Sequence, residues 1–321
     1  MEEIFERAYH STQKKKIDFN SKWCYSYRDS TRRGPAPLGL WLRRGTFRET
    51  VEGIIIMDRL TSRKNDLIRR FRLLGSEGKS RQAWGEFVCD GEKLLGEAVA
   101  HGAEITAVLW GGSPRLEVPC PAQYLVPPEL LDYASPLKHS GGVLFTVRIC
   151  PRPLTSPGRT LVLETVQDPG NLGTILRTAN ALDVDTVLLT GDCADPYHPK
   201  TVRAGMGAVF RQRFHEMERG QVRAFLSAHG LRLWGAALSD RAQDIRRVSL
   251  RHAAVAVGSE GRGLSREMLE LCDGELIIPM NGQCESLNAA VAAAIILWEL
   301  RRAGDGGETD RRKEGDGDGG F

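Results

Sequence analysis

The segment from residue 253 to residue 301 constrains the fold most, because a strand-turn-helix pattern occurs in it twice. Its first half begins with the apolar stretch Ala253–Val257, which predicts a buried strand. Glycines follow at positions 258, 261 and 263, and we expect a helix to start near Leu264 with Ser265 as its cap. Such a glycine cluster is typical of an ordinary strand-to-helix turn, but it also lets a ligand approach the backbone closely.

The second half begins with Ile277 and Ile278, and the proline that follows them disfavours helical geometry and predicts a strand end. Ser286-Leu287-Asn288 then precedes an alanine-rich run, Ala289–Glu299, which predicts a helix capped by the serine or the asparagine. Two strand ends and two helix starts should therefore lie close together. Ligands of open α/β sheets bind at the carboxyl ends of strands, so we expect a cofactor site here.

Strand and helix patterns also alternate between residue 160 and this segment. The expected strands are Thr160–Glu164, Thr186–Leu189 and Leu231–Ala237, the expected loop is Val166–Gly173, and the expected helices are Thr174–Leu182 and one within Asp195–Gly207. This alternation predicts an α/β fold with a mostly parallel sheet covered by helices on both faces.

Residues 57–150 carry a second, smaller set of strands and helices. The set opens with a basic amphipathic helix, in which Leu67, Ile68, Phe71 and Leu74 fall on one face. The proline-rich segment 151–159 then predicts a linker. Because 321 residues are enough for two domains, we expect one over 57–150 and another over 160–303.

The two ends of the chain, residues 1–56 and 304–321, show no sustained periodicity, and we expect both to be disordered. Met57 also offers an alternative start codon. In residues 1–81, 19 Lys and Arg stand against 10 Asp and Glu. This excess favours a polyanion partner, although a solvated surface gives the same pattern.

Composition argues against several classes of protein. No run of about 18 apolar residues predicts a membrane span, and the N-terminus lacks the apolar core of a signal peptide, so we expect a cytoplasmic protein. The seven cysteines stand singly without paired spacing, which predicts reduced packing residues and no metal site. Neither a dinucleotide-binding G-x-G-x-x-G nor a phosphate-binding G-x-x-x-x-G-K-[ST] occurs, and the first absence disfavours a nicotinamide-dependent oxidoreductase.

Three motifs resemble the signatures of the SpoU (TrmH-like) family of RNA ribose 2′-O-methyltransferases, within the SPOUT superfamily. They are DPGNLGTILRTA from residue 168, GSEGRGLS from residue 258 and IPMNGQCESLN from residue 278. The resemblance covers residues 61–302 and implies a trefoil-knotted, Rossmann-like parallel sheet preceded by a small α/β RNA substrate-binding domain. The expected knot rests wholly on this resemblance, since knots are nearly absent from other folds.

The resemblance also implies the roles of individual residues. Backbone groups of Gly258, Ile278 and Leu287 would hold S-adenosylmethionine, with Met280 beside its adenine ring. The catalytic pocket would contain Arg177, Asn171, Glu260, Ser286 and Asn288, and RNA would contact Arg63, Lys64, Lys200 and Arg203. An arginine is hardly ever deprotonated, so we expect Arg177 to hold a phosphate and stabilise the developing alkoxide.

Each of these residues also has an ordinary structural explanation. Arg177 and Glu260 would then face solvent, and Ser286 or Asn288 would only cap a helix. The chain departs from the family pattern at Gly205, where a small hydroxyl residue is usual, and after Asn288, where Ala-Ala replaces Val-Ser.

Two functions remain after these observations. The first is S-adenosylmethionine-dependent 2′-O-methylation of ribosomal or transfer RNA by a homodimer paired through the alanine-rich helix. The alternative is a non-catalytic RNA-binding protein that keeps the fold. Such a protein would be expected to lack Arg177, Asn171 or Asn288, and all three are present.

Overall fold

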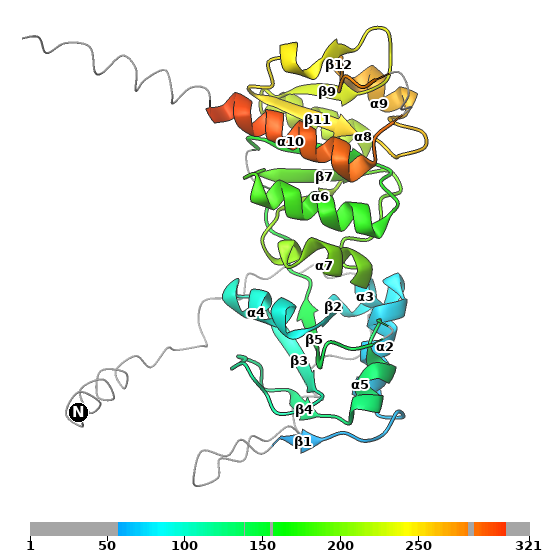
Figure 1. Cartoon of the computed structure of the whole chain (residues 1–321), viewed down its shortest axis with the longest axis vertical. Helices are drawn as coiled ribbons and strands as arrows, with labels where there is room; N and C mark the ends of the chain where they lie inside the picture. Colours follow the sequence, from blue (N-terminus) through cyan, green and yellow to red (C-terminus); the bar gives the residue numbers. More distant parts are fainter. Residues whose placement is uncertain (1–56, 138, 155–156, 282–285, 306–321) are drawn as a thin grey trace, which may run out of the picture. The chain divides into compact units, whose positions relative to one another are not determined.

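The computed structural model describes residues 57–137, 139–154, 157–281 and 286–305 (Figure 1). The expected disorder of residues 1–56 and 306–321 lies outside the described residues, as do Cys24 and Cys284. Residues 304 and 305 were also expected to be disordered, but they are helical. The predicted domain boundaries and the knot stay predictions.

A seven-stranded sheet occupies the second half of the chain, in the order β10-β12-β9-β11-β6-β7-β8. Its strands are β6 (Thr160–Glu164), β7 (Thr186–Thr190), β8 (Phe214–Glu216), β9 (Arg232–Ala236), β10 (Gln243–Asp244), β11 (Ala253–Val257) and β12 (Gly274–Ile277). Every neighbouring pair is parallel, which confirms the predicted parallel α/β architecture. All seven strands therefore present their carboxyl ends at one edge of the sheet.

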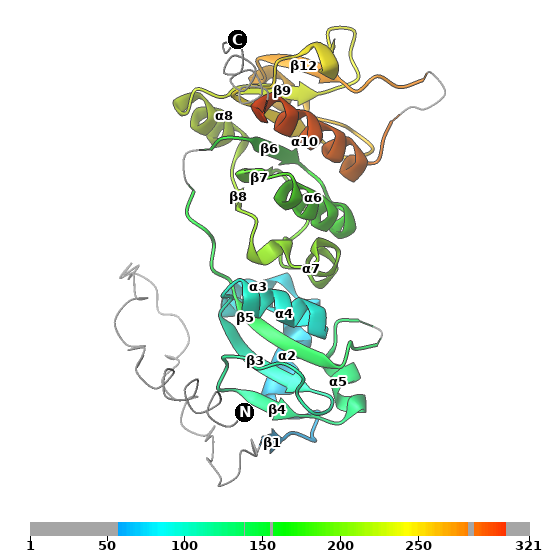
Figure 2. The same cartoon turned by 60° about the vertical axis from the view of Figure 1, so that its left-hand side comes forward.

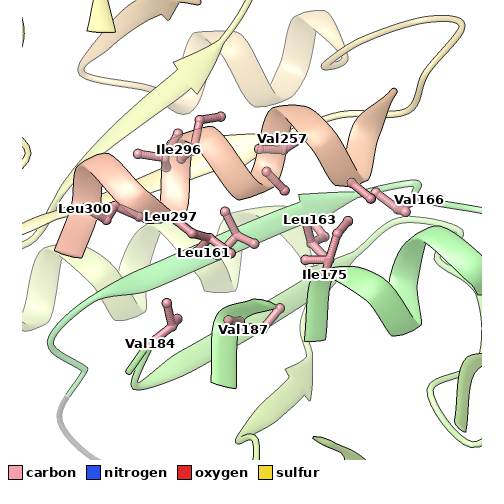
Figure 3. Close-up of a cluster of buried hydrophobic side chains, with 14 of the residues drawn as sticks. Leu161, Leu163, Val166, Ile175, Val184, Val187, Val257, Ile296, Leu297 and Leu300 are labelled. Atoms are coloured by element: carbon pink, nitrogen blue, oxygen red, sulfur yellow. The ribbon is translucent and has the colours of Figure 1, made fainter. Parts of the chain in front are cut away.

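Helices cover both faces of this sheet. Leu161 and Leu163 of β6 pack with α6 (Pro169–Ala181) and α10 (Ala289–Asp305) on one face, as Figure 3 shows. Val162 points the other way, into a cluster with α8 (Arg219–Ala228) and α9 (Arg266–Leu271), and Figure 2 shows α8 on the side opposite α10. Burial on both faces explains why these strands are continuous apolar runs rather than alternating ones.

The start of α6 differs from the sequence prediction. We expected a loop as far as Gly173, but the helix begins at Pro169. Proline suits the first helical position because its missing N–H is not needed there, and the Asp168 side chain caps the helix by accepting the Asn171 N–H at 2.8 Å. Asn171 is therefore a first-turn helical residue, and Arg177 lies about two turns into the helix rather than one.

Helix α7 (Pro199–Gly205) packs very closely against α6, and it confirms the helix predicted after Asp195. A Cβ atom on Gly173 would lie 2.3 Å from the Thr201 carbonyl oxygen, so only glycine allows this approach. The short 3-10 helices Ala208–Phe210 and Ile245–Arg247 and the elements β8, α8 and β10 have no counterpart in the sequence predictions.

The helix caps at the carboxyl edge are as predicted. Ser265 caps α9 by accepting the Met268 N–H at 3.1 Å, and Asn288 caps α10 by accepting the Ala290 N–H at 3.0 Å. α10 runs to Asp305, six residues beyond the predicted end at Glu299.

A five-stranded sheet of order β1-β4-β3-β5-β2 precedes these elements. Its strands are β1 (Asp58–Arg59), β2 (Glu86–Asp90), β3 (Ile105–Trp110), β4 (Gln123–Leu125) and β5 (Val143–Arg148), and its helices are α2 (Asp66–Ser76), α3 (Gly78–Trp84), α4 (Glu92–Ala100) and α5 (Pro128–Ala134). β5 runs antiparallel to its neighbours β2 and β3. The basic helix α2 buries Ile68, Phe71 and Leu74, as its periodicity predicts.

Of the cysteines that the structure describes, all five are free thiols, and only Cys150 is exposed. This agrees with a packing role for the other four. Within the described residues, no helix has the length and apolarity needed to cross a bilayer, and no three His, Cys, Asp or Glu side chains gather as metal ligands would.

Candidate active site

Gly258 and Ile278 lie at the carboxyl edge of the parallel sheet, directly after β11 and β12. These two strands flank β9, and Ala256 and Glu275 both pair with Gly235. Neighbouring strands are about 4.8 Å apart, so the two ends stand about 10 Å from each other at nearly the same level. The structure thus brings together the two strand ends that the sequence predicted to meet.

The turn after β11 closes tightly on itself. Ser259 and Gly263 exchange backbone hydrogen bonds, Ser259 N–H to Gly263 O at 3.2 Å and Gly263 N–H to Ser259 O at 2.9 Å. A Cβ atom on Gly258 would lie only 2.1 Å from the Gly263 carbonyl group. Gly258 is therefore required by the close backbone contact.

Three polar side chains from the three motifs form one hydrogen-bonded cluster. Asn171 donates its Nδ2–H to Glu260 Oε1 at 2.7 Å, and Asn288 donates to Asn171 Oδ1 at 3.1 Å. Asn288 also donates to Glu260 Oε1, and the Ala289 N–H reaches the same oxygen at 3.3 Å. Residues separated by up to 117 positions therefore meet, and we call Asn171, Glu260 and Asn288 the polar cluster.

A cavity of about 400 Å³ adjoins the polar cluster. One wall consists of residues 165–168, which follow β6, and the other of residues 259–262 from the turn after β11. Asn171 and Ala289 complete the lining. The volume of the cavity lies within the range of small-molecule sites in proteins.

Cys193 also lies near the carboxyl edge of the sheet, where its thiol donates to the Leu163 and Thr190 carbonyl oxygens. Burial raises the pKa of this thiol. The reactive thiolate is thereby disfavoured, so Cys193 is not suited to act as a nucleophile.

The structure does not place Arg177 in the polar cluster. Its side chain is exposed, and no hydrogen bond or ion pair joins it to another residue that the structure describes. It follows Thr174 by three positions on α6, so the two are neighbours on the helix surface. Thr174 lines a second, open groove of about 540 Å³ between α6 and α10, and Arg177 therefore flanks that groove.

The other predicted site residues have separate environments. Ser286 is exposed two residues before Asn288, Met280 and Leu287 are half-buried, and Ile278 packs against the core beneath α10. Arg63 and Lys64 are exposed before α2, and Lys200 and Arg203 are exposed on α7. Neither cationic pair lines the cavity.

Comparison with known proteins identifies the family. Residues 158–298 match the SpoU rRNA Methylase family. A tRNA/rRNA methyltransferase of Synechocystis, described as uncharacterized, is 34% identical over 259 residues, covering 76% of this chain and 93% of the relative. The chain belongs to the SpoU family.

Two further members of the SpoU family carry more informative names. The 23S rRNA (guanosine(2553)-2′-O)-methyltransferase RlmP of Bacillus subtilis is 30% identical over 251 residues, which are 76% of this chain and 100% of the relative. The crystal structure of the SpoU methyltransferase AviRb from Streptomyces viridochromogenes, in complex with the cofactor AdoMet, superposes with a TM-score of 0.68 at 27% identity. It covers 74% of this chain and 98% of that one.

Sequence reasoning missed several residues of the SpoU-type site. Gln167, Asp168 and Arg262 line the cavity, although two of the three stand within motifs that the sequence displays. Glu164 is buried at the end of β6 beneath the cavity walls. The only signal for Glu164 was a carboxylate that ends an otherwise apolar strand.

Proposed function

We propose that the protein transfers a methyl group from S-adenosylmethionine to a ribose 2′-hydroxyl in ribosomal or transfer RNA. The observation that carries this proposal is the polar cluster, in which one residue from each SpoU-type motif meets the other two beside a cavity. The named activities of relatives support the same reaction type.

The carboxyl edge of the sheet suits S-adenosylmethionine, which supplies an activated methyl group when it is bound. The four residues expected to hold it lie beside the cavity and are not part of its lining. Gly258, Ile278 and Leu287 offer backbone groups near the carboxyl edge, and Gly258 allows the turn that carries the first of these groups to close against Gly263. The half-buried apolar side chains of Ile278 and Met280 can clamp a flat ring. This arrangement also accords with the proposed trefoil knot, whose loop would contain these segments.

The polar cluster can position the hydroxyl that receives the methyl group. Three donors fix Glu260 Oε1, while no donor among the described residues reaches Oε2. That oxygen can therefore accept a hydrogen bond from the ribose 2′-hydroxyl and orient it toward the methyl donor. Asn171 and Asn288 would hold the carboxylate in place for this step.

Cationic side chains outside the cavity would bind the RNA backbone. Arg63 and Arg72 both lie over the Tyr133 ring, at 4.6 and 4.4 Å from its centroid, which makes a small basic and aromatic surface. Exposed Lys64 adds to its charge, and Lys200 and Arg203 offer further phosphate contacts on α7.

We also propose that two copies pair through the groove between α6 and α10. Trp298 is 58% exposed and Val291 is 49% exposed there, and both line the groove with Ala294 and Ile295. Large exposed apolar side chains of this kind mark interaction surfaces. Arg177 flanks the same groove, so a second copy would bring another arginine to this edge and could complete each active site.

Trp298→Arg should convert the dimer to a monomer, because it places a charge in the apolar contact. Sedimentation should give twice the chain mass for the wild type and one chain mass for the variant. Leu238→Arg is the matched control, since Leu238 is 62% exposed outside the groove, and it should leave the dimer intact. A wild-type protein that is monomeric at micromolar concentration and fully active would contradict the proposal.

The methylation itself is tested with total RNA from a strain that lacks the gene. The full chain and tritiated S-adenosylmethionine should label this RNA, and ribose-methylation mapping should locate the label at a ribose 2′-oxygen. RNA binding without any transfer would favour the alternative of a non-catalytic RNA-binding protein.

A further inference from the structure

Glu164 is a buried carboxylate that none of the assigned roles uses. It is the last residue of β6 and is only 1% exposed. The preceding residue, Leu163, pairs with Val257, so Glu164 lies beside Gly258, where the turn after β11 begins. A buried carboxylate is costly unless several donors satisfy it, and this one sits directly beneath the candidate site.

Three hydrogen bonds satisfy Glu164, and two of them come from Ser265. The Ser265 backbone N–H donates to Oε2 at 2.7 Å, and its hydroxyl donates to Oε1 at 2.7 Å. Arg219 of α8 donates its Nε–H to Oε1 at 2.5 Å. This hydrogen bond raises the pKa of the Arg219 guanidinium, so Arg219 stays charged.

These bonds join the two walls of the cavity at their bases. Thr165, the residue after Glu164, begins the wall formed by residues 165–168, and Ser265 follows the segment that forms the other wall. Thr165 adopts a positive φ of 56°, which is rare for a β-branched residue and ties the start of its wall to one conformation. Its N–H donates to the Thr190 carbonyl oxygen at 3.0 Å.

Ser265 connects the same carboxylate to the other wall. It caps α9, and the residues before it, 259–263, close through the Ser259–Gly263 backbone bonds. The turn is therefore held at three places, by β11 at its start, by its own backbone bonds, and by Glu164 at its end. β11 ties the start of the turn to β6 through the pairing of Val257 with Leu163, and Glu164 ties the end of the turn to the same strand, from which the opposite wall extends.

We propose that Glu164 is a positioning residue that sets the width of the cavity beside the cofactor-binding residues by holding Ser265 against the end of β6. Arg219 assists by holding the carboxylate in the rotamer that faces Ser265. The competing explanation is a buried ion pair that affects only global stability. The cofactor's identity rests on the proposed function, but the coupling of the two walls does not.

The test compares Glu164→Gln, Ser265→Ala and Arg219→Gln with Arg223→Gln. The last is a matched control, because Arg223 also lies on α8 and makes a bidentate pair with Asp273, at 2.6 and 2.8 Å, that does not touch the cavity walls. Ser265→Ala keeps the backbone bond to Glu164 and tests the idea even if Glu164→Gln does not fold.

Hydrogen exchange of amides 259–265 is measured first, in protein without cofactor. We expect exchange there to be about tenfold faster in Glu164→Gln, since a bond to a charged acceptor is weakened, and unchanged in Arg223→Gln. Equal protection of this segment in all four variants and the wild type would overturn the proposal, whatever reaction the protein performs.

The affinity for S-adenosylmethionine is measured second, by calorimetry. The dissociation constant should rise about tenfold in Glu164→Gln and less in Ser265→Ala, with kcat at saturating cofactor close to wild type. A fall in kcat without a change in affinity would contradict a positioning role. Absence of any binding to the wild type would refute the proposed function and leave the exchange result to decide on the wall coupling.

Discussion

Arg177→Ala should slow methyl transfer to RNA by about 10² to 10³-fold, the usual loss when one charge-stabilising contact to a transition state is removed. The side chain is exposed and has no partner among the described residues, so its removal costs the folded protein little. It does not line the cavity, and the affinity for S-adenosylmethionine should stay within about twofold of wild type by calorimetry.

Arg177→Lys separates charge from geometry. A lysine keeps the positive charge but lacks the planar fork that contacts two oxygens at once, so we expect only partial rescue. Arg266→Ala is the control, because it removes another exposed arginine, whose one ion pair within the described residues is with Glu270 of its own helix. Near-native turnover in Arg177→Ala, measured with a tritiated methyl donor, would remove this residue from the mechanism.

The family resemblance predicted that the members of the polar cluster share a pocket, and local structure explains the positions of two of them. Asn288 caps a helix that the alanine-rich sequence predicts. Glu260 lies in a glycine-bracketed turn after an apolar strand. The parallel sheet then brings all strand ends to one edge. Their meeting follows from the topology, although the hydrogen bonds themselves do not follow from the sequence.

The burial and the hydrogen bonds of Glu164 could not be predicted, because they depend on Ser265, which lies 101 positions away. From the sequence it is one carboxylate at a strand end, where a solvent-exposed position is the ordinary expectation. Only the pairing of β6 with β11 places it beneath the turn. The start of α6 was missed for the opposite reason, since Pro-Gly is a strong local turn signal that the Asp168 cap and the helical position of Pro169 override.

The motif and the structure of one chain place Arg177 differently. Its motif predicts a place in the active site, whereas the described residues leave it on the flank of the apolar groove. A second copy packed on Trp298 and Val291 would reconcile the two observations. The Trp298→Arg variant should then lose methyl transfer together with its dimeric mass.

Gly258→Ala should abolish most cofactor binding while Gly261→Ala, three residues later in the same turn, should not. A Cβ atom at position 258 would lie 2.1 Å from the Gly263 carbonyl carbon and oxygen and 2.4 Å from the Leu264 nitrogen. These are backbone atoms that cannot swing aside, so the turn must open. At position 261 nothing lies within 4 Å, and the backbone has no positive φ.

Opening the turn displaces residues 259–262, which form one wall of the cavity and carry Glu260. Overpacking costs about 1–3 kcal/mol, and if this energy must be recovered on binding, the affinity for S-adenosylmethionine falls about 10- to 100-fold. Gly261→Ala should change neither affinity by more than about twofold nor stability by more than about 0.5 kcal/mol. Calorimetry and thermal unfolding of both variants measure these effects, and equal affinities in the two would mean that the turn closure around Gly258 does not shape the cofactor site.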